Sequence, residues 1–543
     1  MKKVEKKIQL TILFSFILSL AIAQSEAPPF LQKQGSATQL IVNGNPFLML
    51  AGELGNSTAS SIYDMESVCP LLQKMHLNTM LVPAYWELIE QEEGIFDFTL
   101  IDEIIDLARK YDFKIVFLWF GAWKNSMSCY APSWVKENYK KYPRAITESN
   151  KSLEILSAFD CNNLEADKRA FTQFMKHIAE KDSKQQTVIM VQVENEIGML
   201  ESARDYCLKA NELFYSDVPS QLIDYLIKNK ETLRPSLLKL WENNGYKTQG
   251  KWTELFGTGL ETEEIFMAWH YGLFFQEVAK AGKEAYPLPL FLNAALNSRG
   301  RKPGQYPSAG PLAHLLDIWR AAAPAIDFLS PDIYDPGFQD WCSQYHVAGN
   351  PLFIPEIRLS EANAIQALYA FGEHDAIGFS PFSIESISNP DEYPLTHCYK
   401  MLRQILPLLG KMQGRGKNNG ILLDDKIREQ VIHRNNYDFT FNHYYSLPWE
   451  KHSEFDWPEA GAILIELAEK EYLIAGSGIV VTFSNSKNDG SITGILSIDE
   501  VELNKNEIIP LRRLNGDQSH QGRHLRIPSG KWSIQHVKLY DYK

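Results

Sequence analysis

Eight short apolar segments recur between residues 40 and 410 of this chain, and they limit its fold more than any other feature. Each is four to seven residues long and rich in β-branched or aromatic side chains, and polar or turn-forming residues bound it, which is typical of strands buried on both faces. Amphipathic stretches such as 100–108 separate the segments. Strands that alternate with helices form parallel sheets, and eight such strands close a (β/α)8 TIM barrel. The segments are 47–51, 79–82, 114–119, 187–193, 288–292, 328–333, 352–355 and 376–379.

The pattern changes near residue 410, which predicts two structural domains. We expect a (β/α)8 catalytic barrel over 36–410, with an enlarged connection over 194–287 after its fourth strand. The Gly- and Lys-rich stretch 410–420 predicts a linker or exposed loop. Beyond it, strand-like segments separated by Gly, Ser, Asn and Asp predict a β-sandwich-like accessory domain over 421–543.

The N-terminus has the three parts of a secretory signal peptide. Four lysines among the first seven residues precede an apolar run over 8–23, which ends in Ala21-Ile22-Ala23. The alternative is a membrane anchor, but the run is short for a spanning helix, which needs about 20 apolar residues. We therefore expect cleavage near Ala23, a periplasmic or extracellular protein, and no membrane insertion after cleavage.

Charge and cysteine usage exclude several classes of partner. The formal net charge of −13 argues against nucleic acid and anionic membranes, which select clustered Lys and Arg, and is compatible with a neutral substrate. The 6 cysteines and 13 histidines form no metal-binding spacing. We expect no metal and no cofactor. Disulfides and free thiols both stay open, and the oligomeric state is not indicated.

Two of the predicted strands end in carboxylates. The fourth runs into Glu194, Asn195 and Glu196, and the seventh runs into Glu356, with Arg358 two residues later. The carboxyl ends of barrel strands face the active site, and burying such groups is costly unless they are paired or used. A cluster that caps the next helix is the alternative for the first group. Together, the two strand ends fit the pair of carboxyl groups that glycoside hydrolysis requires.

These motifs resemble the clan of (β/α)8 retaining glycosidases, and in particular the glycoside hydrolase family 35 β-galactosidases. Residues 191–198, Val-Gln-Val-Glu-Asn-Glu-Ile-Gly, are similar to that family's Val-Gln-x-Glu-Asn-Glu-Tyr-Gly motif. Residues 85–90 with 94–98 resemble its second-strand motif, and Gly52-Glu53 resembles its first-strand Gly-Glu. The resemblance extends over 36–410 and implies a retaining, exo-acting β-galactosidase that removes terminal β-galactosyl residues from oligo- or polysaccharides by double displacement.

The resemblance also implies roles for individual residues. Glu196 would be the acid/base, Glu356 the nucleophile, and Glu194 a supporting residue. Asn195 would bind the sugar 2-hydroxyl, and Tyr334 would hydrogen-bond the nucleophile. Glu53 and Tyr85 are candidate galactose contacts. Among the aromatic residues near strand ends, we expect at least one to line the pocket; these are Trp86, Trp119, Trp123 and Trp341.

One departure from the family pattern concerns the sugar. The third-strand loop of the family carries Ala-Glu-Trp, whose Glu grips galactose, whereas this chain has Gly121-Ala122-Trp123. Together with the unlike stretch 124–134 and the longer separation from Glu196 to Glu356, this difference indicates a divergent bacterial branch with family 42 character. Two alternatives therefore stay open. One is another exo-β-glycosidase of the clan, a β-glucosidase or β-arabinosidase, and the other is a catalytically silent carbohydrate-binding barrel.

Overall fold

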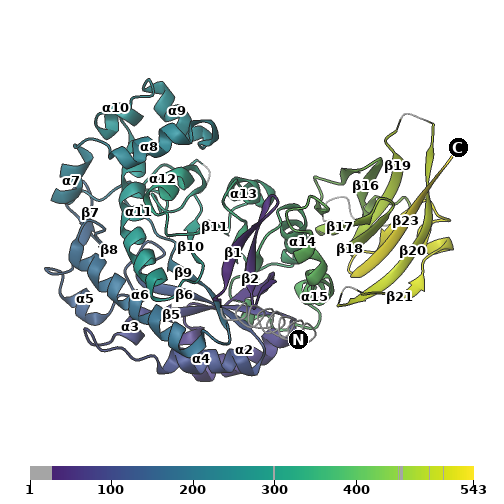
Figure 1. Ribbon diagram of the computed structural model, residues 1–543, viewed down its shortest axis with the longest axis horizontal. Coiled ribbons are helices and arrows are strands. Elements are labelled where there is room, and N and C mark those ends of the chain that lie inside the picture. Colours follow the sequence, from purple (N-terminus) through teal and green to yellow (C-terminus); the bar gives the residue numbers. More distant parts are fainter. Residues whose placement is uncertain (1–26, 298–299, 451, 453–456, 488–489, 506) are drawn as a thin grey trace, which may run out of the picture.

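Eight parallel strands form a closed barrel in the computed structural model (Figure 1), which describes residues 27–297, 300–450, 452, 457–487, 490–505 and 507–543. Each predicted segment overlaps one barrel strand, so the expected TIM barrel is confirmed. The fourth strand is β9 and the seventh is β12, as the sequence predicted. In chain order the strands are β4(Met49–Glu53), β5(Thr79–Tyr85), β6(Lys114–Lys124), β9(Val188–Asn195), β10(Leu290–Ala295), β11(Phe328–Ile333), β12(Phe353–Ile357) and β13(Gly378–Pro381).

The barrel strands are buried on both faces, because helices cover the outside of the barrel and side chains fill its interior. Every residue of β5 is buried, as is every residue of β9. The expected amphipathic stretch 100–108 lies in α4, which buries Ile101, Ile104 and Ile105. Helices of this layer include α2(Ile62–Lys74), α4(Thr99–Lys110), α6(Cys161–Asp182), α11(Leu260–Ala285), α12(Leu316–Ala322), α14(Asn363–Glu373) and α15(Pro394–Met412).

Shorter elements fill the connections. The enlarged connection after β9 holds four helices before α11, and among them α8 contacts α12 while α9 contacts α10. These helices are α7(Leu208–Phe214), α8(Ser220–Lys228), α9(Pro235–Asn243) and α10(Trp252–Phe256). Other short elements of the barrel part include α3(Trp86–Ile89), α5(Ser133–Glu137), α13(Phe338–Tyr345), β7(Arg144–Ile146) and β8(Ser152–Leu156).

A small antiparallel sheet precedes the barrel and is formed by β1(Phe30–Gln34), β2(Ala37–Val42) and β3(Asn45–Pro46). The predicted signal peptide lies in residues 1–26, outside the described residues, so it stays a prediction. Within the part of the chain that the structure describes, no helix is both long and apolar enough to cross a membrane. All six cysteines are described, and none of them forms a disulfide.

The C-terminal part is β-rich, as expected. A six-stranded sheet and a four-stranded sheet, both antiparallel, share one apolar core to which Leu464 and Ile474 contribute from the first sheet and Phe439 and Val481 from the second. The six-stranded sheet is ordered β14(Asn418–Leu423), β17(Ala460–Ala468), β18(Glu471–Ser477), β23(Ser533–Tyr542), β20(Ile492–Asn504), β21(Glu507–Arg513). The four-stranded sheet is ordered β15(Glu429–Arg434), β16(Tyr437–His443), β19(Ile479–Asn485), β22(Leu525–Ile527).

The two parts are in direct contact. α14 packs against β14 and β17, and Figure 1 shows this helix beside the C-terminal sheets. The stretch 410–420 is therefore not an exposed linker throughout: Gly410, Asn418 and Gly420 are buried. The first C-terminal strand begins at Asn418, three residues before the predicted boundary.

Candidate active site

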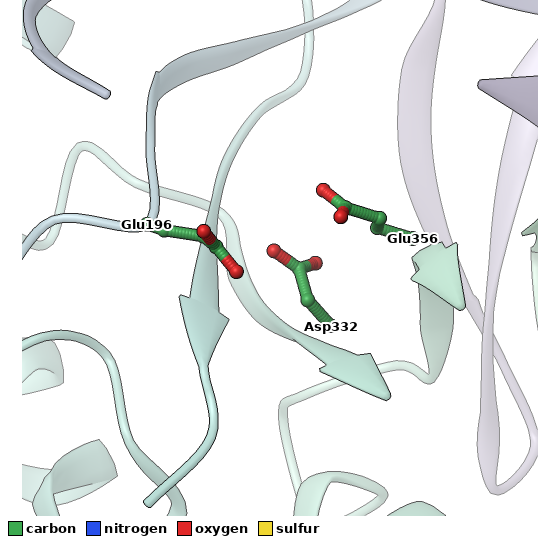
Figure 2. Close-up of side chains that lie close together, drawn as sticks. All are labelled: Glu196, Asp332 and Glu356. Atoms are coloured by element: carbon green, nitrogen blue, oxygen red, sulfur yellow. The ribbon is translucent and has the colours of Figure 1, made fainter. Parts of the chain in front are cut away.

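The end of β9 directs two neighbouring glutamates to different layers of the barrel. Glu194 and Glu196 both have left-handed backbone conformations, with φ of 61° and 47°. Non-glycine residues adopt this conformation rarely, and it breaks the alternation of a regular strand. The Glu194 carboxylate accepts hydrogen bonds from the backbone N–H groups of Trp123 (2.6 Å) and Gly121 (3.2 Å) on β6. Glu196 instead points toward the carboxyl ends of β11 and β12 (Figure 2).

Glu196, Asp332 and Glu356 bring three carboxyl groups together at the carboxyl end of the barrel. One oxygen from each lies within 4.8 Å of the others, and all three side chains are buried. Figure 2 shows them converging from the ends of β9, β11 and β12. Tyr334 donates a hydrogen bond to Oε1 of Glu356, as the resemblance implied. The structure thus brings together both predicted catalytic glutamates and the predicted tyrosine.

Burial and mutual repulsion set the protonation of this cluster. Burial first, and the Glu356 carboxylate second, raise the pKa of Glu196 to about 7. The same two causes raise the pKa of Asp332 well above its usual range. Desolvation and a like charge both disfavour the ionised form, so a proton is retained near neutral pH. The site therefore offers a carboxylic acid, which can donate a proton, beside a carboxylate.

Lys124 supplies a buried positive charge at the same place. Its ammonium group donates a hydrogen bond to Oδ1 of Asn195 (2.8 Å) and opposes the rise in the pKa of Glu196 and of Glu53. Glu53, at the end of β4, is also buried, and burial followed by repulsion from Glu356 raises its pKa well above the usual range. Glu53 from β4 and Lys124 from β6 thus add two further polar groups around Glu196 and Glu356.

Sequence reasoning missed the residues that hold this arrangement. Asn293, in β10, accepts the backbone N–H of Glu196 (2.9 Å) and donates to Oδ2 of Asp332 (2.6 Å). Asn125 donates to Oε2 of Glu196. Asp332 and Lys124 also received no role from the sequence. The available signal was a polar residue at the carboxyl end of a barrel strand, which holds for Lys124 and Asp332.

Several buried polar atoms of the site have no hydrogen-bond partner among the described residues. They are Oε1 of Glu53, Nδ2 of Asn195, Oδ1 of Asp332 and Oε2 of Glu356. Buried polar groups are almost always paired, and each exception needs an explanation. Three acceptors and one donor suit a ligand that carries several hydroxyl groups, because a hydroxyl both donates and accepts.

The three carboxyl oxygens are also close enough to share a cation. Hard cations take carboxylate ligands of this type. The ammonium group of Lys124 opposes the rise in the pKa of both Glu196 and Asp332, so a positive charge already lies beside the three carboxyl groups. The expectation that no metal is needed stays a prediction.

Residues 63–262 match the glycoside hydrolase family 42 model, which is described as beta-galactosidase. The matched segment includes Glu196 and ends before Glu356. Residues 395–526 match a domain of unknown function, DUF5597. No curated protein matches this chain in sequence.

Solved structures with distant likeness are beta-galactosidases too. The enzyme of the psychrophilic Marinomonas ef1 is 12% identical, with a TM-score of 0.45 over 67% of this chain and 60% of that one. The enzyme of Bacillus circulans sp. alkalophilus is 15% identical, with a TM-score of 0.45 over 67% and 57%. A catalytic mutant of Gan42B, a GH42 beta-galactosidase from G. stearothermophilus, is 10% identical, with a TM-score of 0.47 over 90% and 98%. The chain thus spans about 60% of the first of these, and likenesses this distant say nothing about its activity.

The matched family model is that of family 42, so the expected likeness to family 35 specifically receives no support. The residues that depart from the family pattern, Gly121 and Ala122, lie within β6 and are tightly packed. Gly121 leaves no space for a side chain, since a Cβ there would lie 2.5 Å from Oε1 of Glu194 and 2.8 Å from Oδ1 of Asp167. Asp167, on α6, accepts from the indole of Trp119 (3.0 Å). The end of β6 is thus packed onto this buried acid pair, and Ala122 is itself fully buried.

Tyr85 and Trp341, two further predicted sugar contacts, have other interactions in the structure. The hydroxyl of Tyr85 donates to the backbone oxygen of Asn56 (2.7 Å), and its ring stacks on Tyr130. Trp341 lines a separate cavity of about 450 Å³ beside α9. The remaining predicted aromatics, Trp86, Trp119 and Trp123, are fully buried in the core. A contact of Tyr85 or Trp341 with sugar stays a prediction.

Proposed function

We propose that this protein is a retaining β-galactosidase that removes terminal β-galactosyl residues from oligo- or polysaccharides. The observation that carries the proposal is the close approach of the Glu196 and Glu356 carboxyl groups. Around them lie buried polar atoms that have no hydrogen-bond partner among the described residues. Their nearest oxygens lie within 4.8 Å. Retaining glycosidases hold their carboxyl groups about 5–5.5 Å apart, whereas inverting ones need about 6.5–9.5 Å to admit a water molecule. The separation therefore supports retention of anomeric configuration.

In the first step, the Glu356 carboxylate attacks the anomeric carbon while protonated Glu196 gives its proton to the departing oxygen. The bond from the anomeric carbon to the leaving group breaks, and a covalent glycosyl-enzyme forms. In the second step, Glu196, now ionised, accepts a proton from water as the water attacks the same carbon and releases Glu356. Glu196 thus gives up one proton and regains one in each cycle, while Glu356 forms and then releases one bond to the anomeric carbon.

The neighbouring residues suit this chemistry. Tyr334 hydrogen-bonds Oε1 of the nucleophile and leaves Oε2 free to attack. Lys124 fixes Oδ1 of Asn195, so the unpaired Nδ2 of that amide can donate to a sugar hydroxyl. Glu53 offers an unpaired acceptor for another hydroxyl. We assign Asn195 and Glu53 to sugar binding, Tyr334 to holding the nucleophile, and Lys124 to positioning Asn195.

The identity of the sugar as galactose is inferred from family likeness. The motif around Glu196 resembles family 35 and the matched model is that of family 42, and both groups are β-galactosidases. A panel of nitrophenyl glycosides tests the assignment. Release from the β-galactoside is expected. Faster release from the β-glucoside or β-arabinoside would replace the proposed sugar, and sugar binding without any release would mean a silent binding barrel.

We also propose that the protein acts in the periplasm or outside the cell, because its first 23 residues have the composition of a signal peptide. Mass spectrometry of the protein from the native host should find a mature N-terminus near Gln24. A chain that keeps its first 23 residues would contradict the proposal.

A further inference from the structure

A cavity of about 830 Å³ lies where the barrel meets the C-terminal part. On the barrel side, its wall includes Ile333 and Tyr334 from the end of β11, Ile357 from the end of β12, and the start of α13. These strand ends are at the same edge of the barrel as Glu356. The cavity therefore begins beside the candidate active site.

Tyr334 links the cavity to the catalytic pair directly. Its hydroxyl contacts Glu356, and the same residue forms part of the cavity wall. Arg358 lies over the ring of Tyr334, with its guanidinium carbon 5.3 Å from the ring centre, and it also lines the cavity. A sugar chain that leaves the cleavage site on this side would pass along the tyrosine.

The opposite wall belongs to the C-terminal part. It is made by Leu422 at the end of β14, by the turn that holds Lys426 and Ile427, and by Glu459 just before β17. The backbone N–H groups of Lys426 and Ile427 both donate to Oδ1 of Asp424 (2.8 and 2.6 Å), which fixes the turn. Ile427 is 42% exposed although it is apolar. This turn presents a rigid, partly apolar surface toward the barrel.

The polar groups of the cavity fit hydroxyl groups. Oε2 of Glu459 and Oδ2 of Asp335 are buried and have no hydrogen-bond partner among the described residues. The other carboxyl oxygen of Glu459 accepts from Gln366 of α14 (3.4 Å), which holds the side chain at the boundary between the two parts. Unpaired acceptors call for donors, and the hydroxyl groups of a sugar supply them.

The volume of the cavity and the charge of its wall restrict the class of ligand further. The volume falls in the range of about 300–1,000 Å³ that holds ligands of several rings. The wall carries more acidic than basic side chains, which disfavours an anionic ligand. The acidic residues are Asp335, Asp340, Asp424 and Glu459, and the basic ones are Arg358 and Lys426.

We propose that this cavity binds the leaving-group side of a neutral oligosaccharide substrate, and that the C-terminal part thereby takes part in choosing the substrate. The inference rests on the proposed function. The enzyme would then prefer substrates with at least two sugar units beyond the scissile bond over a galactoside with a small leaving group. The C-terminal turn at Lys426 and Ile427 would supply part of this preference.

The test compares a double variant of this turn, Lys426→Ala with Ile427→Ala, with a matched control, Val431→Ala with Lys487→Ala. The control residues are exposed and do not line the cavity, and Val431 is also 42% exposed. For each protein, kcat/KM is measured on a β-linked galactotriose and on nitrophenyl β-galactoside. The ratio of the two values should fall about fivefold to tenfold in the turn variant, which corresponds to about 1–1.4 kcal/mol of lost binding. The control should keep the wild-type ratio, and a wild-type ratio in the turn variant would overturn the inference.

A binding measurement separates this inference from the proposed function. Titration calorimetry of the full chain carrying Glu356→Gln measures affinity for galactotriose and for galactose without turnover. The longer sugar should bind more tightly, and the turn substitutions should remove that gain while leaving circular dichroism and the unfolding temperature as in the control. If the wild type cleaves no galactoside but this gain is present, the proposed function fails and the binding site stands. If the gain is absent, the cavity is not part of the substrate site.

Discussion

Glu194 and Glu196 are separated in the chain by a single residue, Asn195, yet their carboxyl groups face different layers of the barrel. Glu194 accepts the N–H of Trp123 and pairs with Asp167 on α6, where burial raises the pKa of Glu194 well above its usual range and that of Asp167 to about 6. Glu196 instead lies within 4.8 Å of Glu356. In a regular strand, residues i and i+2 face the same side. The left-handed conformations at both glutamates remove this alternation and leave one of them for chemistry.

Replacing Glu196 should reduce activity most on substrates whose leaving group must be protonated before it departs. Glu196→Ala should lower kcat/KM by about 10²–10⁴-fold on an alkyl β-galactoside, the usual contribution of a general acid. It should cost much less on dinitrophenyl β-galactoside, because that leaving group departs without a proton. Steady-state kinetics on a series of leaving groups measures the difference. Glu194→Gln serves as the control and should keep the wild-type dependence on leaving group; an equal loss on all substrates in Glu196→Ala would refute the acid role.

Removing the nucleophile should leave a site that accepts a replacement from solution. Glu356→Ala should reduce turnover to background, because no glycosyl-enzyme can form. Azide should then attack from the vacated side and give a galactosyl azide of inverted configuration, which proton NMR identifies. If rescue gave the azide with retained configuration, Glu356 would not be the nucleophile. Tyr334→Phe keeps the carboxylate, so it should lose activity that azide does not restore.

The acid should also set the alkaline side of the pH profile. Burial and the neighbouring Glu356 raise the pKa of Glu196 to about 7. The first step needs Glu196 protonated, so kcat/KM should be level just below this pH and fall tenfold for each pH unit above it. A profile of kcat/KM against pH on an alkyl β-galactoside checks this. A flat profile through pH 9 would mean that the essential acid is another group.

Lys124 gives a second test of the same electrostatics. Its ammonium group opposes the rise in the pKa of Glu196, so Lys124→Met should move the alkaline limb to higher pH. The substitution also removes the hydrogen bond that fixes Asn195, which should lower kcat/KM by about tenfold to a hundredfold. Lys136→Met, on the partly exposed helix α5, is the control and should change neither value. A shift of the limb to lower pH would contradict the assigned interaction.

Local sequence patterns predicted the barrel strands and the candidate catalytic pair, whereas other residues of the site belong to no such pattern. Strands such as β11 are buried on both faces, so their composition alone marks them, and Glu196 and Glu356 stand in motifs that resemble a known clan. Asp332 and Lys124 are single polar residues at strand ends, and their meaning appears only when the barrel closes and brings their strands beside β9 and β12. Asn293 bridges two residues that are distant in the chain, and no local pattern indicates such a contact.

The packing behind the site should be sensitive to a single methyl group at Gly121. A Cβ there would lie 2.5 Å from Oε1 of Glu194, 2.8 Å from Oδ1 of Asp167 and closer still to the indole nitrogen of Trp119. All three side chains are fully buried, so they have little space to move. Overpacking of this kind costs about 1–3 kcal/mol, and Gly121→Ala should therefore lower the unfolding temperature and the folded yield. Gly410→Ala is the control, because its Cβ would meet only Pro46, at 3.3 Å, and alanine is favoured within a helix such as α15. Thermal unfolding followed by circular dichroism compares the two variants, and equal stability would show that the end of β6 at Ala122 can shift away from the acid pair.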